Sequence, residues 1–124
     1  VLLRGNGAKA FCAGGEVRSL SQACLAHPGA VPPLAGHFFA PEYRLDYRLH
    51  TYPKPLICCG HGYVRGGGMG LLQGAGLRIV TPSSRLAMPE ISIGLYPDVG
   101  ASWFLSRMHG KLGLFLCLTG AHMT

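Results

Sequence analysis

The chain has 124 residues, which is at most one domain's worth, and 48% of them are hydrophobic. This composition predicts a packed core and excludes intrinsic disorder. The formal charge is +6, but the basic residues are scattered singly, so a nucleic acid and a phosphate-bearing small molecule fit that charge equally well.

The first half of the chain predicts a strand, a glycine turn, and two helices separated by a loop. Residues 1–7, VLLRGNG, predict a short buried strand that ends in a turn. Residues 9–20, KAFCAGGEVRSL, predict a glycine turn that leads into a helix. Residues 27–36 are rich in proline and predict a loop. Residues 38–52, FFAPEYRLDYRLHTY, predict a helix that starts at Pro41.

The second half repeats the alternation of strand, glycine turn and helix. The predicted order is a strand at 54–64, a helix at 68–76, a strand at 77–82, a strand with an irregular return at 84–97, and helices at 98–108 and 111–120. Trp103 and Phe104 are expected to anchor the first of these last two helices in the core. The alternation predicts α/β layering with short mixed strands.

A triple glycine, Gly66-Gly67-Gly68, lies between a predicted strand and a predicted helix. Neither the G-x-G-x-x-G pattern nor the G-K-[ST] pattern of nucleotide-binding loops is present. Two readings remain, namely close packing of a helix on a sheet and exposure of backbone N–H groups to a ligand. Because Gly14-Gly15 form a second such turn, two N–H donors could converge on one carbonyl oxygen, as acyl chemistry requires.

The chain has five acidic residues, and their surroundings differ. Glu90 lies among apolar residues, where burial would raise its pKa and suit it to general acid–base work. Asp98 and Glu42 each follow a proline at a predicted helix start, so spacing alone favours a role at the helix terminus over a role in catalysis. Glu16 is expected to interact with the dipole of the helix that it opens, and Asp46 is expected to be solvated or paired with an arginine.

The cysteines and histidines predict no further chemistry. The five cysteines include no C-x-x-C pair, so we expect reduced thiols, with no disulfide framework and no structural zinc. Cys58 and Cys59 are expected on opposite faces of one strand, and His61 is expected to be packed and hydrogen-bonded. The histidines show no ligand spacing, so no metal is assigned.

Four segments carry a family resemblance, and they are AFCAGGEVRSL, HGYVRGGGMGL, AMPEISIGLYPDVGASWFL and GKLGLFLCLTG. Together they resemble the enoyl-CoA hydratase/isomerase (crotonase) superfamily. Within it they are most similar to the 3-hydroxyisobutyryl-CoA hydrolase branch, and the run PEISIGLYPDVG is specific to that branch. The resemblance implies a crotonase-like ββα spiral, with residues 1–124 as a partial acyl-CoA-binding core domain that lacks the family's N-terminal strands and C-terminal helices.

The resemblance also implies a set of site residues. The backbone N–H groups of Gly15 and Gly67 would form an oxyanion hole for the thioester carbonyl. Glu90 would be the catalytic carboxylate that acts on water or on the acyl group. Asp98 would bind the hydroxyl end of the substrate or share the proton transfer, and Glu42 would be a further carboxylate on the substrate side.

One departure from the family pattern bears on the reaction. Hydratases of the superfamily place a first catalytic Glu two residues after the triple glycine, where this chain has Gly70. We therefore expect hydrolysis of a short β-hydroxyacyl-CoA, with 3-hydroxyisobutyryl-CoA as the substrate. The alternatives are hydratase or isomerase activity and an inactive truncated fragment. Milder departures are Glu16 for Asp, Arg65 for an apolar residue and Ala101 for Gly.

The implied partners are few. Acyl-CoA is the expected substrate, and no separate cofactor is expected because coenzyme A is part of that substrate. The basic surplus would attract the CoA phosphates. We expect no nucleic-acid or membrane partner, leave a homo-oligomer open, and expect a cytoplasmic location, or the mitochondrial matrix if the source is eukaryotic.

Overall fold

A computed structural model describes all residues 1–124, and it confirms the predicted α/β fold. In chain order the elements are β1 (Leu2–Arg4), β2 (Ala10–Cys12), α1 (Val17–Ala26), α2 (Pro33–His50), β3 (Ile57–Gly60), β4 (Tyr63–Arg65), α3 (Gly67–Gln73), β5 (Leu77–Val80), β6 (Arg85–Ala87), a 3-10 helix (Glu90–Ile93), α4 (Ala101–Leu105) and α5 (Leu112–Thr119). No helix combines the length and the apolarity that a membrane span requires.

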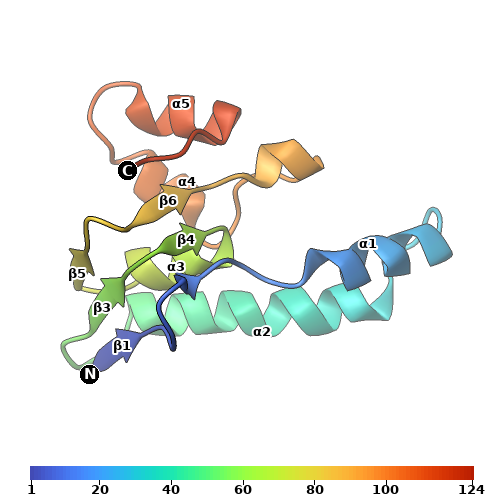
Figure 1. The fold of residues 1–124 in the computed structure, drawn as a ribbon. Coiled ribbons are helices and arrows are strands. Elements are labelled where there is room, and N and C mark those ends of the chain that lie inside the picture. The colour runs from blue at the N-terminus through green and yellow to red at the C-terminus, as the bar shows by residue number, and fades with distance from the viewer.

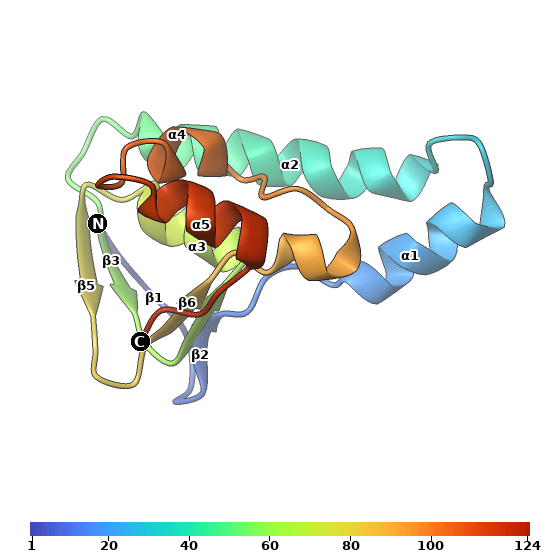
Figure 2. The ribbon, with the colours of Figure 1, turned by 90° about the horizontal axis from the view of Figure 1, so that it is seen from above.

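The strands form two three-stranded sheets, and both are parallel. One sheet has the order β1-β3-β5 and the other the order β2-β4-β6, so each successive pair of strands adds one strand to each sheet. Helices follow the pairs, which gives a ββα spiral. In Figure 1 the two sheets lie end to end, and in Figure 2 the strands occupy one side of the molecule while α2 to α5 lie on the other.

The chain passes from one sheet to the other at His61 and Gly62, inside a segment predicted as one strand. Gly62 has a positive φ of 57°, and a Cβ there would collide with the carbonyl oxygen of Lys9, so only glycine fits. A His61 ring nitrogen, Nε2, lies 2.8 Å from the carbonyl oxygen of Gly7, which confirms the expectation of a packed, hydrogen-bonded histidine.

Helix α2 begins eight residues before the predicted start, so the predicted loop over 27–36 is too long. Pro33 occupies the first helical position, where a missing N–H costs nothing, and Pro41 lies in the helix interior. Pro41 leaves the carbonyl of His37 without its helical N–H, but both residues are exposed, so water can reach that carbonyl. Glu42 is therefore in the middle of α2, and the helix-start explanation for it is wrong.

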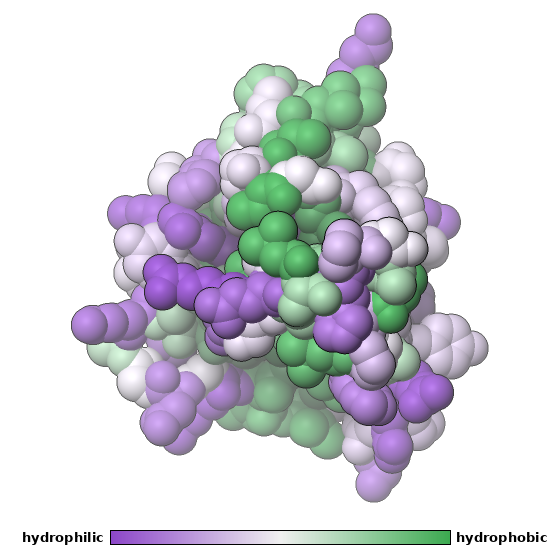
Figure 3. Space-filling view, turned by 90° about the vertical axis from the view of Figure 1, so that its right-hand side faces the viewer, coloured by the Kyte–Doolittle hydropathy of each residue, from purple (hydrophilic) through white to green (hydrophobic).

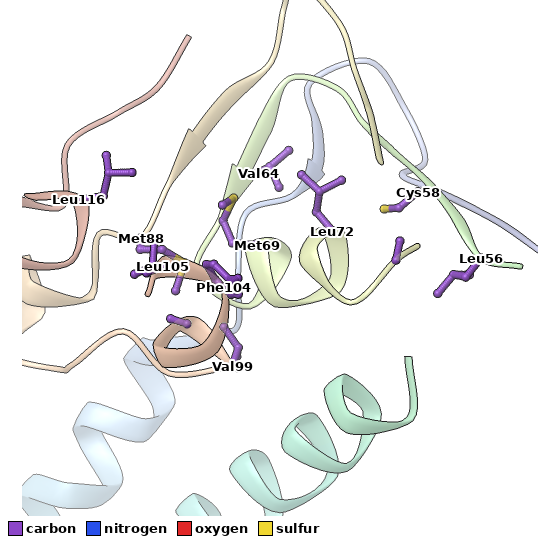
Figure 4. Close-up of a cluster of buried hydrophobic side chains, with 12 residues drawn as sticks. Leu56, Cys58, Val64, Met69, Leu72, Met88, Val99, Phe104, Leu105 and Leu116 are labelled. Carbon is purple, nitrogen blue, oxygen red and sulfur yellow. The ribbon is translucent and has the colours of Figure 1, made fainter. Parts of the chain in front are cut away.

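A single hydrophobic core lies between the sheets and helices α3, α4 and α5 (Figure 4). Phe104 belongs to it and is 7% exposed, whereas Trp103 is 46% exposed, so the prediction holds for Phe104 and is wrong for Trp103. The Trp103 ring instead meets His50 of α2 edge-on at 4.6 Å between centroids. The twelve core residues are Leu56, Cys58, Val64, Met69, Leu72, Ala75, Met88, Val99, Ala101, Phe104, Leu105 and Leu116.

Helix α3 approaches α2 so closely that a side chain at the contact would have to displace its neighbours. A Cβ built on two glycines of α3 and on its C-cap glycine would touch α2, at 2.5 Å from Glu42 Oε1, 3.0 Å from Asp46 Oδ1 and 3.1 Å from Leu49 Cβ. Close packing therefore explains part of the glycine density in this segment. The contacts follow the same order along both helices, pairing Gly67 with Glu42, Gly70 with Asp46, and Gly74 with Leu49.

Candidate active site

A cleft of about 610 Å³ lies between α1, α2, the triple-glycine turn and the 3-10 helix. Its walls are partly apolar, and hydrophobic residues form a band across the face toward which α1 and the 3-10 helix point (Figure 3). The cleft is lined by all five residues that the resemblance assigns to a site, namely Gly15, Gly67, Glu42, Glu90 and Asp98. Residues up to 83 positions apart in sequence therefore meet in one place.

The two glycine turns adjoin each other at the cleft. A Cβ built on Gly14 would lie 3.7 Å from the backbone nitrogen of Gly67. The N–H of Gly15 donates to no backbone carbonyl, and Gly67 is the first residue of α3, where an N–H has no intrahelical acceptor. Both N–H groups are thus available to a ligand oxygen. The packing and ligand-binding readings of the triple glycine are compatible, because different atoms of the same turn are involved.

Glu90 is a buried carboxyl beside the triple glycine. Its side chain is 6% exposed, Oε1 lies 3.0 Å from where a Cβ on Gly66 would be, and Oε2 has no hydrogen-bond partner. The bond from the Gly66 N–H to the Ala87 carbonyl, 3.2 Å long, ties the glycine turn to the strand that leads into Glu90. Burial raises the pKa of Glu90, and the charges of Asp98 and Glu42 raise it further.

Glu42 faces the same turn from the opposite side, on α2. Burial raises the pKa of its carboxyl, with a further contribution from the charge of Asp98. One turn earlier on α2, the ring of Phe38 packs directly against Gly15. Helix α2 therefore forms one wall of the cleft and contacts both glycine turns.

Asp98 is held by a side chain of α2 rather than by a helix end. The Tyr43 hydroxyl donates to Asp98 Oδ2 at 2.6 Å, and burial together with this bond raises the pKa of Tyr43 far above its usual value. The N-cap of α4 is Gly100, and no side chain caps that helix. The capping explanation for Asp98 is therefore wrong.

Asp46 is the residue that sequence reasoning missed. Both carboxyl oxygens are buried and have no hydrogen-bond partner, so the expectation of a solvated or arginine-paired residue is wrong. Burial, assisted by the charges of Glu42 and Asp98, raises the pKa of Asp46 to about 7. The available signal was its spacing, since Asp46 follows Glu42 by four residues and so lies on the same helix face.

Glu16 lies outside the cleft and caps α1. Its carboxylate accepts hydrogen bonds from the N–H groups of Arg18 and Ser19 at 3.0 and 2.9 Å, which confirms its expected role at the helix start. Hydrogen bonds from Ser19 and from the backbone lower the pKa of Glu16.

No side chain fits at position 70. A Cβ on Gly70 would lie 2.6 Å from the Cβ of Val99 and 3.0 Å from Asp46 Oδ1. Val99 itself has a positive φ of 46°, which is a strained conformation for a β-branched residue. The space that superfamily hydratases give to a glutamate is thus filled by two residues that approach from other elements.

Replacing Asp46 by Asn is expected to change how the free energy of unfolding depends on pH. The folded-state pKa of Asp46 is raised, so the folded protein holds this proton more tightly, and ionisation costs stability as pH rises from about 4 to about 7. The Asn variant cannot ionise, so its stability should exceed that of the wild type at pH 8 and match it at pH 4. Denaturant unfolding at both pH values measures this. Glu16→Gln is the control, because its lowered pKa predicts the opposite sign at pH 8. A parallel pH dependence in wild type and Asp46→Asn would contradict the prediction.

The two-sheet spiral and the acidic cleft over paired glycine turns define an α/β protein of the crotonase type. The sequence model described as enoyl-CoA hydratase/isomerase matches residues 1–124. The chain belongs to the enoyl-CoA hydratase/isomerase family.

Curated relatives share nearly half of their matched residues with this chain. It is 47% identical over 120 residues to the mitochondrial 3-hydroxyisobutyryl-CoA hydrolase of Danio rerio and 44% identical to that of Homo sapiens. Each match covers 97% of this chain and 30% of the relative, so the chain spans less than a third of the length of these proteins.

Solved structures of the same fold include two that are about as similar in sequence. An enoyl-CoA hydratase from Rhodobacter sphaeroides 2.4.1 superposes with a TM-score of 0.90 at 40% identity, over 98% of this chain and 35% of that one. A carnitinyl-CoA dehydratase from Mycobacterium thermoresistibile gives a TM-score of 0.90 at 42% identity, over 99% of this chain and 35% of that one. The match confirms the predicted partial crotonase fold.

Proposed function

We propose that residues 1–124 form the acyl-CoA-binding core of a thioester hydrolase that acts on a short β-hydroxyacyl-CoA, with 3-hydroxyisobutyryl-CoA as the substrate. The observation that carries this proposal is the placement of a buried carboxyl, Glu90, directly against the triple-glycine turn, which adjoins a second glycine turn and has a free N–H group as that turn does. The names of the curated relatives support the substrate class. Those names include the word mitochondrial, which supports a matrix location where the source is eukaryotic.

The proposed reaction follows from the chemistry of these groups. The thioester carbonyl oxygen accepts hydrogen bonds from the N–H groups of Gly15 and Gly67, which stabilise the negative charge that grows on it. Glu90 takes a proton from water as the water oxygen bonds to the carbonyl carbon. The carbon–sulfur bond then breaks, and the proton passes to the departing CoA thiolate. The products are the free hydroxy acid and CoA.

The raised pKa of Glu90 suits both proton transfers, from the water and to the thiolate. A carboxyl that is buried beside other acids takes up a proton more readily than an exposed one, and it can return that proton to a thiolate. Asp98, held by Tyr43, is positioned to orient the acyl group or to share the proton transfer. No Arg or Lys lines this cleft apart from Arg18, so the site assists bond cleavage chiefly through N–H donors and carboxyls.

A substrate panel tests the proposal. The protein produced from its complete reading frame should release free thiol from 3-hydroxyisobutyryl-CoA and should add water to crotonyl-CoA far more slowly. Thiol release and loss of the enoyl chromophore are followed on the same preparation. Hydration of crotonyl-CoA without thiol release from any hydroxyacyl-CoA would overturn the hydrolase proposal.

One observation favours hydration as a second candidate. Asp46 Oδ1 lies beside Gly70, so a carboxyl from α2 stands near the place that hydratases give to a glutamate of α3. A structural relative at 40% identity is named an enoyl-CoA hydratase. The same panel separates the two reactions.

A further inference from the structure

Asp46 lines a second hollow, which the proposed reaction leaves unused. This hollow has a volume of about 290 Å³, and it is bordered by α2 and by the loop that leads into α4. Asp98 lines both this hollow and the main cleft, so the two spaces adjoin at that residue. The lining residues that carry polar side chains are Tyr43, Asp46, Tyr96, Asp98 and Ser102.

The protein offers Asp46 no hydrogen-bond donor. Glu42 and Tyr43 of its own helix and Tyr96 and Asp98 of the facing loop are the titratable groups around it, and the Tyr43 hydroxyl is already bonded to Asp98. Helices α3 and α4 contribute no ionisable side chain. A buried carboxyl without a donor is costly. Both oxygens are enclosed by protein, so a rotation of the Asp46 side chain is needed to turn one of them toward the hollow, where it would accept a hydrogen bond from a molecule that enters.

The distance from the oxyanion position to Asp46 suits a short acyl chain. Gly67 contacts Glu42, and Gly70 contacts Asp46, which is one helical turn further along both α2 and α3. Three or four residues of helix span about 4.5–6 Å. An acyl group with its carbonyl oxygen at Gly67 and its chain directed toward Asp98, where the cleft and the hollow adjoin, would therefore bring a substituent on its β-carbon toward Asp46.

We propose that Asp46 is a specificity-determining residue that accepts a hydrogen bond from the β-hydroxyl of the acyl group. This inference rests on the proposed hydrolysis of a β-hydroxyacyl-CoA and assigns the recognition of its hydroxyl to a residue of α2. An acyl group of the same shape without the hydroxyl leaves the buried carboxyl unsatisfied and binds less well.

The test compares two substrates that differ only in the hydroxyl. kcat/KM for 3-hydroxyisobutyryl-CoA and isobutyryl-CoA is measured on wild type, Asp46→Ala and Asp46→Asn of the protein from its complete reading frame. The Ala variant should lose about 10- to 100-fold on the hydroxylated substrate, as expected for one hydrogen bond to a carboxyl, and less than about twofold on isobutyryl-CoA. Asn keeps an acceptor oxygen and should recover most of the loss. Arg48→Ala, on an exposed part of the same helix, should leave both values unchanged.

Binding provides a readout that does not depend on hydrolysis. Calorimetric titration with the thioether analogues of the two acyl-CoAs should show a preference for the hydroxylated analogue that Asp46→Ala abolishes. If the wild type hydrolyses neither thioester but shows this preference, the proposed reaction fails and the role of Asp46 stands. An equal fall on both substrates in Asp46→Ala, or analogues that bind equally to the wild type, would overturn the inference.

Discussion

Glu90→Gln should reduce kcat for thioester hydrolysis by about 10²- to 10⁴-fold, the range attributed to a positioned acid–base group. Gln has nearly the shape of Glu but cannot take a proton from water. The folded protein should not suffer, because the wild-type carboxyl is buried, has an unpartnered oxygen and has a raised pKa. We therefore expect an unchanged or higher melting temperature at pH 8 together with the loss of activity.

The separation of activity from stability makes this prediction decisive. Glu16→Gln is the matched control, because it makes the same chemical change at an exposed helix cap outside the cleft, and its kcat should stay near the wild-type value. A Glu90→Gln enzyme that keeps more than a tenth of the wild-type kcat would show that another group activates the water. A lost thermal transition would instead indicate a structural role.

The sequence predicts the local elements well because their signals are local. Glycine turns and short apolar runs mark strands and helices wherever neighbouring residues alone decide the backbone conformation. Where two signals compete, local reasoning fails. Pro33 and Pro41 are both suited to a first helical turn, and choosing between them depends on how the whole of α2 packs along α1 and α3.

The separation into two sheets could not be predicted from local patterns. Residues 54–64 have one continuous strand pattern, yet the chain changes sheets at His61 and Gly62. The glycine at this crossing is required by a contact with a residue some fifty positions earlier in the sequence. The backbone of Lys9 occupies the space that a side chain at Gly62 would need. In the sequence alone, a long-range contact of this kind is visible only as a glycine that no local turn or strand signal explains.

The candidate site likewise has residues that the sequence predicts and one residue that it does not. Family motifs predict Glu90, Asp98 and Glu42 as site residues, and the cleft brings all three together with both glycine turns. Asp46 has no motif, and its burial arises because α3 presents glycines to α2 and so lets the two helices approach. Asp46 is buried because the facing residue of α3 is a glycine. The sequence signal for this burial is therefore the glycine and not the aspartate itself.

Gly67→Ala should reduce kcat by about 10²- to 10³-fold, as expected when the substrate oxygen is kept from one oxyanion donor, while leaving the protein folded. The added Cβ would lie 2.5 Å from Glu42 Oε1, which is the far end of a flexible side chain and can move away. Gly67 has a helical backbone that Ala accepts, and Ala is the better helix former. The cost therefore falls on the cleft, where the methyl group and the displaced carboxyl take the place of the thioester oxygen.

Substitutions at two other glycines distinguish a blocked oxyanion site from a general loss of packing. Gly68→Ala meets the backbone carbonyl of Cys12, which cannot move away, so that variant should lose stability as well as activity. Gly76→Ala places its Cβ 3.8 Å from the nearest atom, at ordinary contact distance, and should change neither. The three variants should thus give three different results. Gly67→Ala should lower kcat alone, Gly68→Ala should lower both kcat and the melting temperature, and Gly76→Ala should lower neither. If Gly67→Ala stays folded and works like Gly76→Ala, then the N–H of Gly67 does not stabilise the oxyanion. If it unfolds like Gly68→Ala, then the added methyl group is not tolerated in the packing and the prediction of a folded variant is wrong.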